Sequence, residues 1–159
     1  MEHDSELFAA RWALGLACRD ELVARAEAAR NAGCSGPALA ELGALRDPPR
    51  CDVRELVDRA LDELVALRPS AADACLHVAR AHARAIVSGE VEAVEGARRI
   101  VHEVWDQARE LDDRGLAPFV YWEDEWYDAD SPERVAFCEA AIVEAAKDLL
   151  AAPPSSSRS

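Results

Sequence analysis

Apolar residues recur along this chain at spacings of three and four, which is the period of an amphipathic α-helix. The period is clearest between 92 and 111, where one helical face carries Val94, Ala97, Val101, Val104, Ala108 and Leu111. The segment 52–64 shows the same period after Asp52 and Glu55, which have the spacing of a capping box. We therefore predict a helix in each segment, and we expect the helix over 92–111 to be central to the core.

Residues that favour helix ends divide the N-terminal part of the chain. We expect a first helix over about 5–31, with Ser5 as its N-cap and a bend near Gly15. A shorter helix is predicted over 36–45. It ends before the linker 46–51, whose adjacent prolines are incompatible with a continuing helix.

The C-terminal part carries similar signals. Ser70 and Gly89 are residue types that begin and end a helix, and Ser131 followed by proline begins the last one. The segment 118–127 has aromatic and acidic residues without a decisive period. Both a short helix and an irregular loop therefore remain open for it.

Composition favours the same class of structure. Half of the 159 residues are hydrophobic but only 6% are aromatic, and alanine dominates the apolar set, which suits helices better than strands. A chain of this length buries one ordinary core. We predict an all-α fold, a compact bundle of about five to seven helices without a β-sheet. It would form a single helical domain over 1–152, followed by a disordered C-terminal tail over 153–159.

The charge balance limits the partners. The chain has 31 acidic and 18 basic residues and a formal net charge of -13, which repels nucleic-acid phosphate and anionic membrane surfaces. No stretch approaches the roughly 20 apolar residues that cross a bilayer, and the N-terminus lacks the pattern of a signal peptide. We expect neither a nucleic-acid partner nor a membrane.

The cysteines indicate a reducing compartment. They number five, contain no CxxC pair, and include Cys18, Cys75 and Cys138 among apolar residues of predicted helices. We interpret them as buried free thiols of a soluble, cytoplasmic protein.

Catalytic and metal-binding motifs are not evident. His77 and His82 are five residues apart, a spacing that places them on different sides of a helix rather than in a chelating pair. The residues three before the interior histidines are not glutamates, so the Glu-x-x-His pattern of di-metal bundles is missing. The nucleophile, phosphate-loop and zinc signatures are missing too. We therefore predict no catalytic residue, no metal and no cofactor.

The most unusual stretch of the composition is 121–133, which has no basic residue. Aromatic and acidic side chains alternate there, and the candidate partner-binding residues are Trp122, Glu123, Asp124, Glu125, Trp126 and Tyr127. Trp and Tyr are frequent interface anchors, and clustered acids steer a basic partner. The alternative is that the two tryptophans, four residues apart, hold a short helix on the core while the acids face water.

The C-terminal half also resembles a group of small helical proteins common in actinobacteria. The likeness covers about 80–150 and is carried by Ser88-Gly89-Glu90, Glu95-Gly96-Ala97-Arg98 and the acidic stretch before the last helix. It implies a compact helical protein in which Gly89 takes a positive φ and Gly96 lets a neighbouring helix approach. Arg98 or Arg99 would then pair with the acids at 123–125. The group has no known activity to transfer.

Three hypotheses about function follow. The first is a non-enzymatic protein-binding module, of the immunity-protein, antitoxin or accessory-subunit kind, whose acidic aromatic surface binds a basic protein. The second is a small hydrolase or metal-dependent enzyme in which Glu95, His102 and the acids at 123–125 converge. The third is a structural or regulatory homodimer formed through the apolar stripe of Phe8, Trp12 and Leu16.

Overall fold

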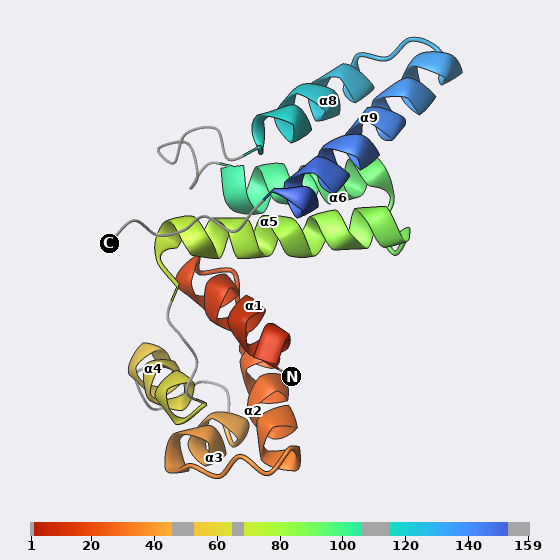
Figure 1. The fold of residues 1–159 in the computed structure, drawn as a ribbon. Helices are drawn as coiled ribbons and strands as arrows, with labels where there is room; N and C mark the ends of the chain where they lie inside the picture. Colours follow the sequence, from red (N-terminus) through yellow and green to blue (C-terminus); the bar gives the residue numbers. More distant parts are fainter. Residues whose placement is uncertain (1, 46–52, 65–68, 106–114, 153–159) are drawn as a thin grey trace. The chain divides into compact units, whose positions relative to one another are not determined.

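The computed structural model describes residues 2–45, 53–64, 69–105 and 115–152. Within these ranges it contains eight α-helices, one π-helical turn and no β-strand (Figure 1), which confirms the predicted all-α class. Contacts divide the chain into two compact units, Met1–Pro69 and Ser70–Ser159. The single domain over 1–152 stays a prediction, and the tail over 153–159 lies outside the described residues.

The first unit contains α1 (Glu2–Ala13), α2 (Arg19–Asn31), α3 (Pro37–Gly43) and α4 (Val53–Glu63). The single helix predicted over 5–31 is two helices, because Gly15 has a φ of 71°, and a left-handed residue ends a helix rather than bending it. The helix α1 begins before Ser5, so Ser5 is not its N-cap. Cys18 is the N-cap of α2 and is exposed rather than buried, unlike Cys75 and Cys138.

The core of the first unit is built from small and branched apolar side chains, and it uses the stripe proposed for a homodimer. Phe8, Leu39, Leu42 and Val57 belong to one buried apolar cluster, and Trp12 packs against it. Phe8 and Trp12 therefore contact the unit's own core rather than forming a free apolar face.

The N-terminus of α3 is capped from a distant position. Both carboxylate oxygens of Glu63, at the end of α4, accept backbone N–H groups at 2.9 Å, one from Ala38 and one from Leu39. These amides belong to the first turn of α3, where no carbonyl of the same helix is available to them. Gly36 leaves room for the carboxylate, since a Cβ there would lie 2.1 Å from Glu63 Oε2.

The second unit contains α5 (Ala71–Ser88), α6 (Ala93–Ile100), η1 (Val101–Trp105), α8 (Ala117–Tyr127) and α9 (Pro132–Ala151), with α9 packed against α5, α6 and α8 (Figure 1). The predicted helix ends are confirmed. Ser70 and Ser131 accept N–H groups three residues ahead, and Gly89 ends α5 with a φ of 74°. The close approach expected at Gly96 is also present, because a Cβ there would lie 2.3 Å from Ile86 Cγ1 of α5.

The helix predicted over 92–111 changes its winding partway. It is α-helical to Ile100 and π-helical from Val101 to Trp105, while Ala108 and Leu111 of the predicted face lie outside the described residues. Ala97 and Val104 are fully buried, so the apolar face is used as expected. On the π-helical turn, Glu103 Oε2 lies 2.9 Å from His82 Nε2 of α5.

Candidate functional site

The acidic aromatic segment is helical. The helix α8 has Pro118 in its first turn, where proline is compatible with a helix, and it ends at Tyr127 with Asp128 as C-cap. Phe119, fully buried, anchors its inner side. The open choice between helix and loop is thus settled for 117–127, and the helix gives every side chain of the segment a defined direction.

Three aromatic side chains of α8 and α9 contact one another in sequence, and we call them the aromatic face: Tyr121, Trp122 and Phe137. Tyr121 and Phe137 are 53% and 55% exposed, and Trp122 is half-buried between them. The ring centroids of Tyr121 and Trp122 are 4.7 Å apart, and those of Trp122 and Phe137 are 5.6 Å apart, both edge-to-face. A partner that covered these rings would remove further apolar area from water, which favours binding.

An ion pair lies beside the aromatic face. Arg134 of α9 pairs with the carboxylate of Glu125 of α8, and its guanidinium carbon lies 5.9 Å from the centre of the Phe137 ring. Both charged side chains are partly exposed, at 45% for Arg134 and 32% for Glu125. A guanidinium is therefore held between a carboxylate and an aromatic ring, each from a different helix.

The inner side of α8 carries Glu123, the one charged side chain that is buried among the described residues, at 7% exposure. Burial raises the pKa of Glu123, because the charged form loses hydration, and the negative charge of Asp124 raises it further. His102 and Arg98 lower the pKa of Glu123 electrostatically. Glu123 is thus a structural group of the inner side rather than part of an exposed surface.

The arginines of α6 pair within their own helix, and the charge of Arg98 also acts on Glu123 of α8. Arg98 and Arg99 pair with Glu95 of their own helix, at 3.4 and 3.1 Å, because spacings of three and four place these side chains together. Arg98 also donates a hydrogen bond to the hydroxyl of Tyr127, and its guanidinium lies 5.9 Å from that ring. Tyr127 is therefore tied to α6, although it is 53% exposed.

The remaining candidates lie on different sides of α8. Trp126 is half-buried between α8 and α9, and its Nε1 donates to Glu139 Oε1 at 3.4 Å. Asp124 is exposed. Of the six predicted contact residues, Asp124 and Tyr127 are exposed, Trp122, Glu125 and Trp126 are partly exposed, and Glu123 is buried.

Sequence reasoning missed Tyr121, Phe137 and Arg134 as members of this site. Phe137 lies outside the apolar stripe of α9 that contains Cys138 and Ile142, and a large apolar residue off the stripe is a signal that sequence inspection can detect. Its contact with Trp122 was not visible, because it depends on how α8 and α9 pack.

The residues proposed for an enzyme do not gather into a metal site. Among the described residues, no group of three or more His, Cys, Asp or Glu side chains is arranged to hold a metal ion. Glu95 faces Arg98 and Arg99, and Glu123 is buried near His102. His82 and Glu103 form a separate two-residue contact between α5 and η1.

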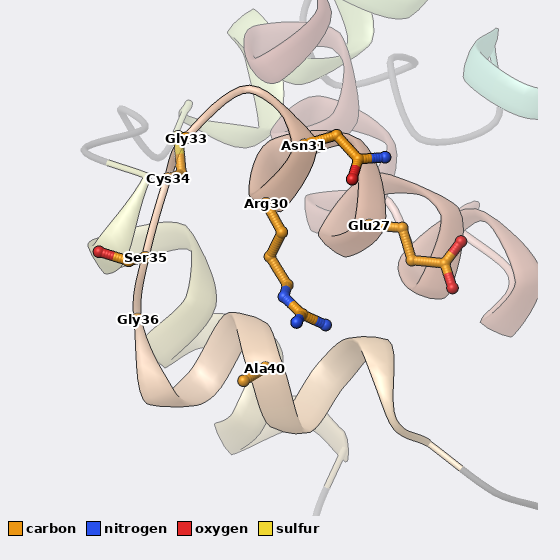
Figure 2. A pocket seen from close by; sticks show the side chains of 8 residues that line it. All are labelled: Glu27, Arg30, Asn31, Gly33, Cys34, Ser35, Gly36 and Ala40. Atoms are coloured by element: carbon orange, nitrogen blue, oxygen red, sulfur yellow. The ribbon is translucent and has the colours of Figure 1, made fainter.

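The first unit has a hollow of about 600 Å³ where α2 turns into α3. Its lining comprises Glu27, Arg30, Asn31, Gly33, Cys34, Ser35, Gly36 and Ala40. Figure 2 shows the side chain of Arg30 extending from α2 toward α3. None of the candidate partner-binding residues lines this hollow.

No protein-family model, no curated protein and no solved structure matches this chain. In the part of the chain that the structure describes, no helix is long and apolar enough to cross a membrane. The resemblance to actinobacterial helical proteins stays a prediction.

Proposed function

We propose that this chain is a non-enzymatic protein-binding module that contacts a basic protein through the aromatic face and the carboxylates around it. An immunity protein, an antitoxin or an accessory subunit of the bacterial cytoplasm would fit this role. The observation that supports the proposal is the exposure of Tyr121 and Phe137 on either side of Trp122.

Aromatic side chains suit an interface because they bury a large area with little loss of conformational entropy. Residues of this kind dominate the affinity of many complexes, in particular where they cluster. On this surface the three rings are already packed against one another, so their orientation is set before a partner arrives. Preorganisation of this kind lowers the entropic cost of binding.

The charge of the surrounding surface favours a basic partner. The stretch 121–133 contributes carboxylates from Glu123, Asp124, Glu125, Asp128, Asp130 and Glu133 and contains no basic residue. All of these except Glu123 are at least partly exposed. Complementary charge accelerates association and disfavours acidic partners, including nucleic acid.

Affinity capture with matched variants tests the proposal. The tagged protein, the double variant Tyr121→Ala/Phe137→Ala and the control Val87→Ala would be incubated with a lysate of the source organism. Val87 is exposed but lies on α5, outside the aromatic face. Captured proteins would be identified by mass spectrometry, and the binding remeasured by calorimetry with the purified partner.

We expect the wild type and Val87→Ala to retain the same basic protein. Loss of two aromatic anchors should weaken its binding by about 30-fold or more, the effect of at least one interface hot spot. If the wild type and the double variant are both folded by circular dichroism and bind the partner with equal affinity, the aromatic face is not the binding surface.

A further inference from the structure

We propose that the aromatic face takes an arginine side chain of the partner, held between the ring of Phe137 and the carboxylate of Glu125. In the free protein Arg134 occupies this position as an internal guanidinium. The inference rests on the function proposed above and specifies the chemistry of the partner: an arginine-bearing segment of a basic protein.

The internal contact shows which chemistry the position accepts. Glu125 supplies a carboxylate from α8, and Phe137 supplies a ring face from α9, with the guanidinium carbon of Arg134 5.9 Å from the ring centre. A carboxylate beside an aromatic ring offers a guanidinium an ion pair and a cation–π contact together. Tyr121 and Trp122 continue the apolar surface beside it.

Arg134 is held weakly enough to be replaced. Its backbone N–H is fixed by the Ser131 hydroxyl, 3.2 Å away, but its side chain is 45% exposed. Ion pairs this exposed are weak, because water and salt screen them and the long side chain loses freedom when it is held. Rotation of the side chain frees the position without disturbing the cap of α9.

The charge of the surface decides between the possible occupants. A second copy of this chain would bring the same excess of acids, from a net charge of -13, against the carboxylates at 124–133. A basic segment brings the opposite charge. Arginine suits the position better than lysine, because its planar guanidinium stacks on a ring while it pairs with a carboxylate.

Fluorescence anisotropy with two labelled peptides tests the inference at low salt. One peptide alternates arginine and glycine, and its twin has lysine in place of every arginine. The quantity compared is the ratio of the two dissociation constants, because the ratio cancels the general attraction of any cationic peptide to an acidic protein. The variants are Phe137→Ala, Glu125→Gln and Arg134→Ala.

The matched control is Asp148→Asn, which removes the same charge as Glu125→Gln. Asp148 is exposed and lies roughly 20 Å from Arg134 along α9, at a rise of about 1.5 Å per residue. We expect the wild type and Asp148→Asn to prefer the arginine peptide, and we expect Phe137→Ala and Glu125→Gln to lose that preference. Circular dichroism confirms that each variant is folded.

Arg134→Ala distinguishes an internal competitor from a structural residue. Its removal should tighten the arginine peptide by about two- to five-fold more than the lysine peptide, which converts to ~0.4–1 kcal/mol, the usual strength of an exposed ion pair. A structural Arg134 predicts an unchanged or smaller preference, which would overturn the inference. Equal binding of both peptides to the wild type would overturn it as well, as would a dimer in light scattering that Phe137→Ala abolishes.

The two proposals fail separately. If capture of a host protein depends on the aromatic face but the peptides bind equally, the arginine inference is wrong and the binding function stands. If the arginine preference is present and depends on Phe137, but capture of a host protein does not depend on the aromatic face, the position binds guanidinium and the proposed function is wrong.

Discussion

The cap that Glu63 provides to α3 predicts a specific coupling between Glu63 and Gly36. Glu63→Ala removes two hydrogen bonds of 2.9 Å from the first turn of α3. Hydrogen bonds to a charged group are worth about 1.5–3 kcal/mol each when nothing replaces them. Water reaches part of this helix end, so we expect a loss of about 2 kcal/mol, near the upper range for an N-terminal cap.

Gly36→Ala reaches the same contact from the other side. Its Cβ would lie 2.1 Å from Glu63 Oε2, whereas its φ of -163° is an extended conformation that alanine adopts. The carboxylate must therefore move away, and the substitution should lose most of the stability that Glu63→Ala loses. In the Glu63→Ala background the obstacle is gone, so the cost of Gly36→Ala should fall by about 1–2 kcal/mol, a coupling typical of contacting residues.

Urea denaturation of the four proteins of this cycle measures the coupling. Glu63→Gln should lie between wild type and Glu63→Ala, because one amide oxygen replaces two carboxylate oxygens. Glu27→Ala, an exposed glutamate of α2, is the control and should change the free energy of unfolding by less than about 0.5 kcal/mol. Additive effects of Gly36→Ala and Glu63→Ala would show that Gly36 and Glu63 do not act through one contact.

Three further predictions concern the second unit. Gly96→Ala places a Cβ 2.3 Å from Ile86 Cγ1 and should cost about 1–3 kcal/mol in urea denaturation, a loss that Ile86→Ala in the same protein should reduce. Ser131→Ala removes the acceptor for the Arg134 N–H and should lower stability by ~1 kcal/mol without changing the arginine preference; a changed preference would tie the cap to binding. Glu123→Gln should raise the free energy of unfolding at pH 7. A carboxyl whose pKa is higher in the folded than in the unfolded state stabilises the fold while it is protonated, and that stability is lost as pH rises from the ordinary value of 4.5 through the raised one. The wild type should therefore lose stability relative to Glu123→Gln across this window, with the exposed Asp124→Asn as control, and parallel pH profiles of wild type and Glu123→Gln would contradict the assigned cause.

Local signals predicted the helix ends well, because a cap depends on residues close in sequence. Ser70, Gly89 and Ser131 behave as their residue types require. Gly15 marks the limit of this reasoning, since its type indicates an interruption but not whether the helix bends or ends. The cap of α3 could not be predicted from the sequence, because Glu63 is 25 residues from Ala38 and only the packing of α4 on α3 brings them together.

The same distinction explains the candidate site. Composition identified the segment that forms α8. It could not distinguish the residues on the inner side of the helix from those on the outer side, because the segment has no clear apolar period. The partner of Glu125 was expected among the arginines of α6 and is Arg134 of α9 instead. Side-chain pairing between helices depends on their relative rotation and register, which no spacing within one helix specifies.

The division of α8 into two sides also determines how a binding role is separated from a structural one. Trp126 is half-buried and donates a hydrogen bond to Glu139 of α9, so Trp126→Ala should weaken binding by displacing α8 and should lower stability as well. Tyr121 and Phe137 are more than half exposed, so their replacement by alanine should reduce affinity with little change in the free energy of unfolding. If the aromatic face binds the partner, substitutions of its exposed residues should lower affinity alone, whereas Trp126→Ala should lower both affinity and stability. If instead affinity follows stability in every variant, the aromatic face contributes to binding only by keeping α8 folded.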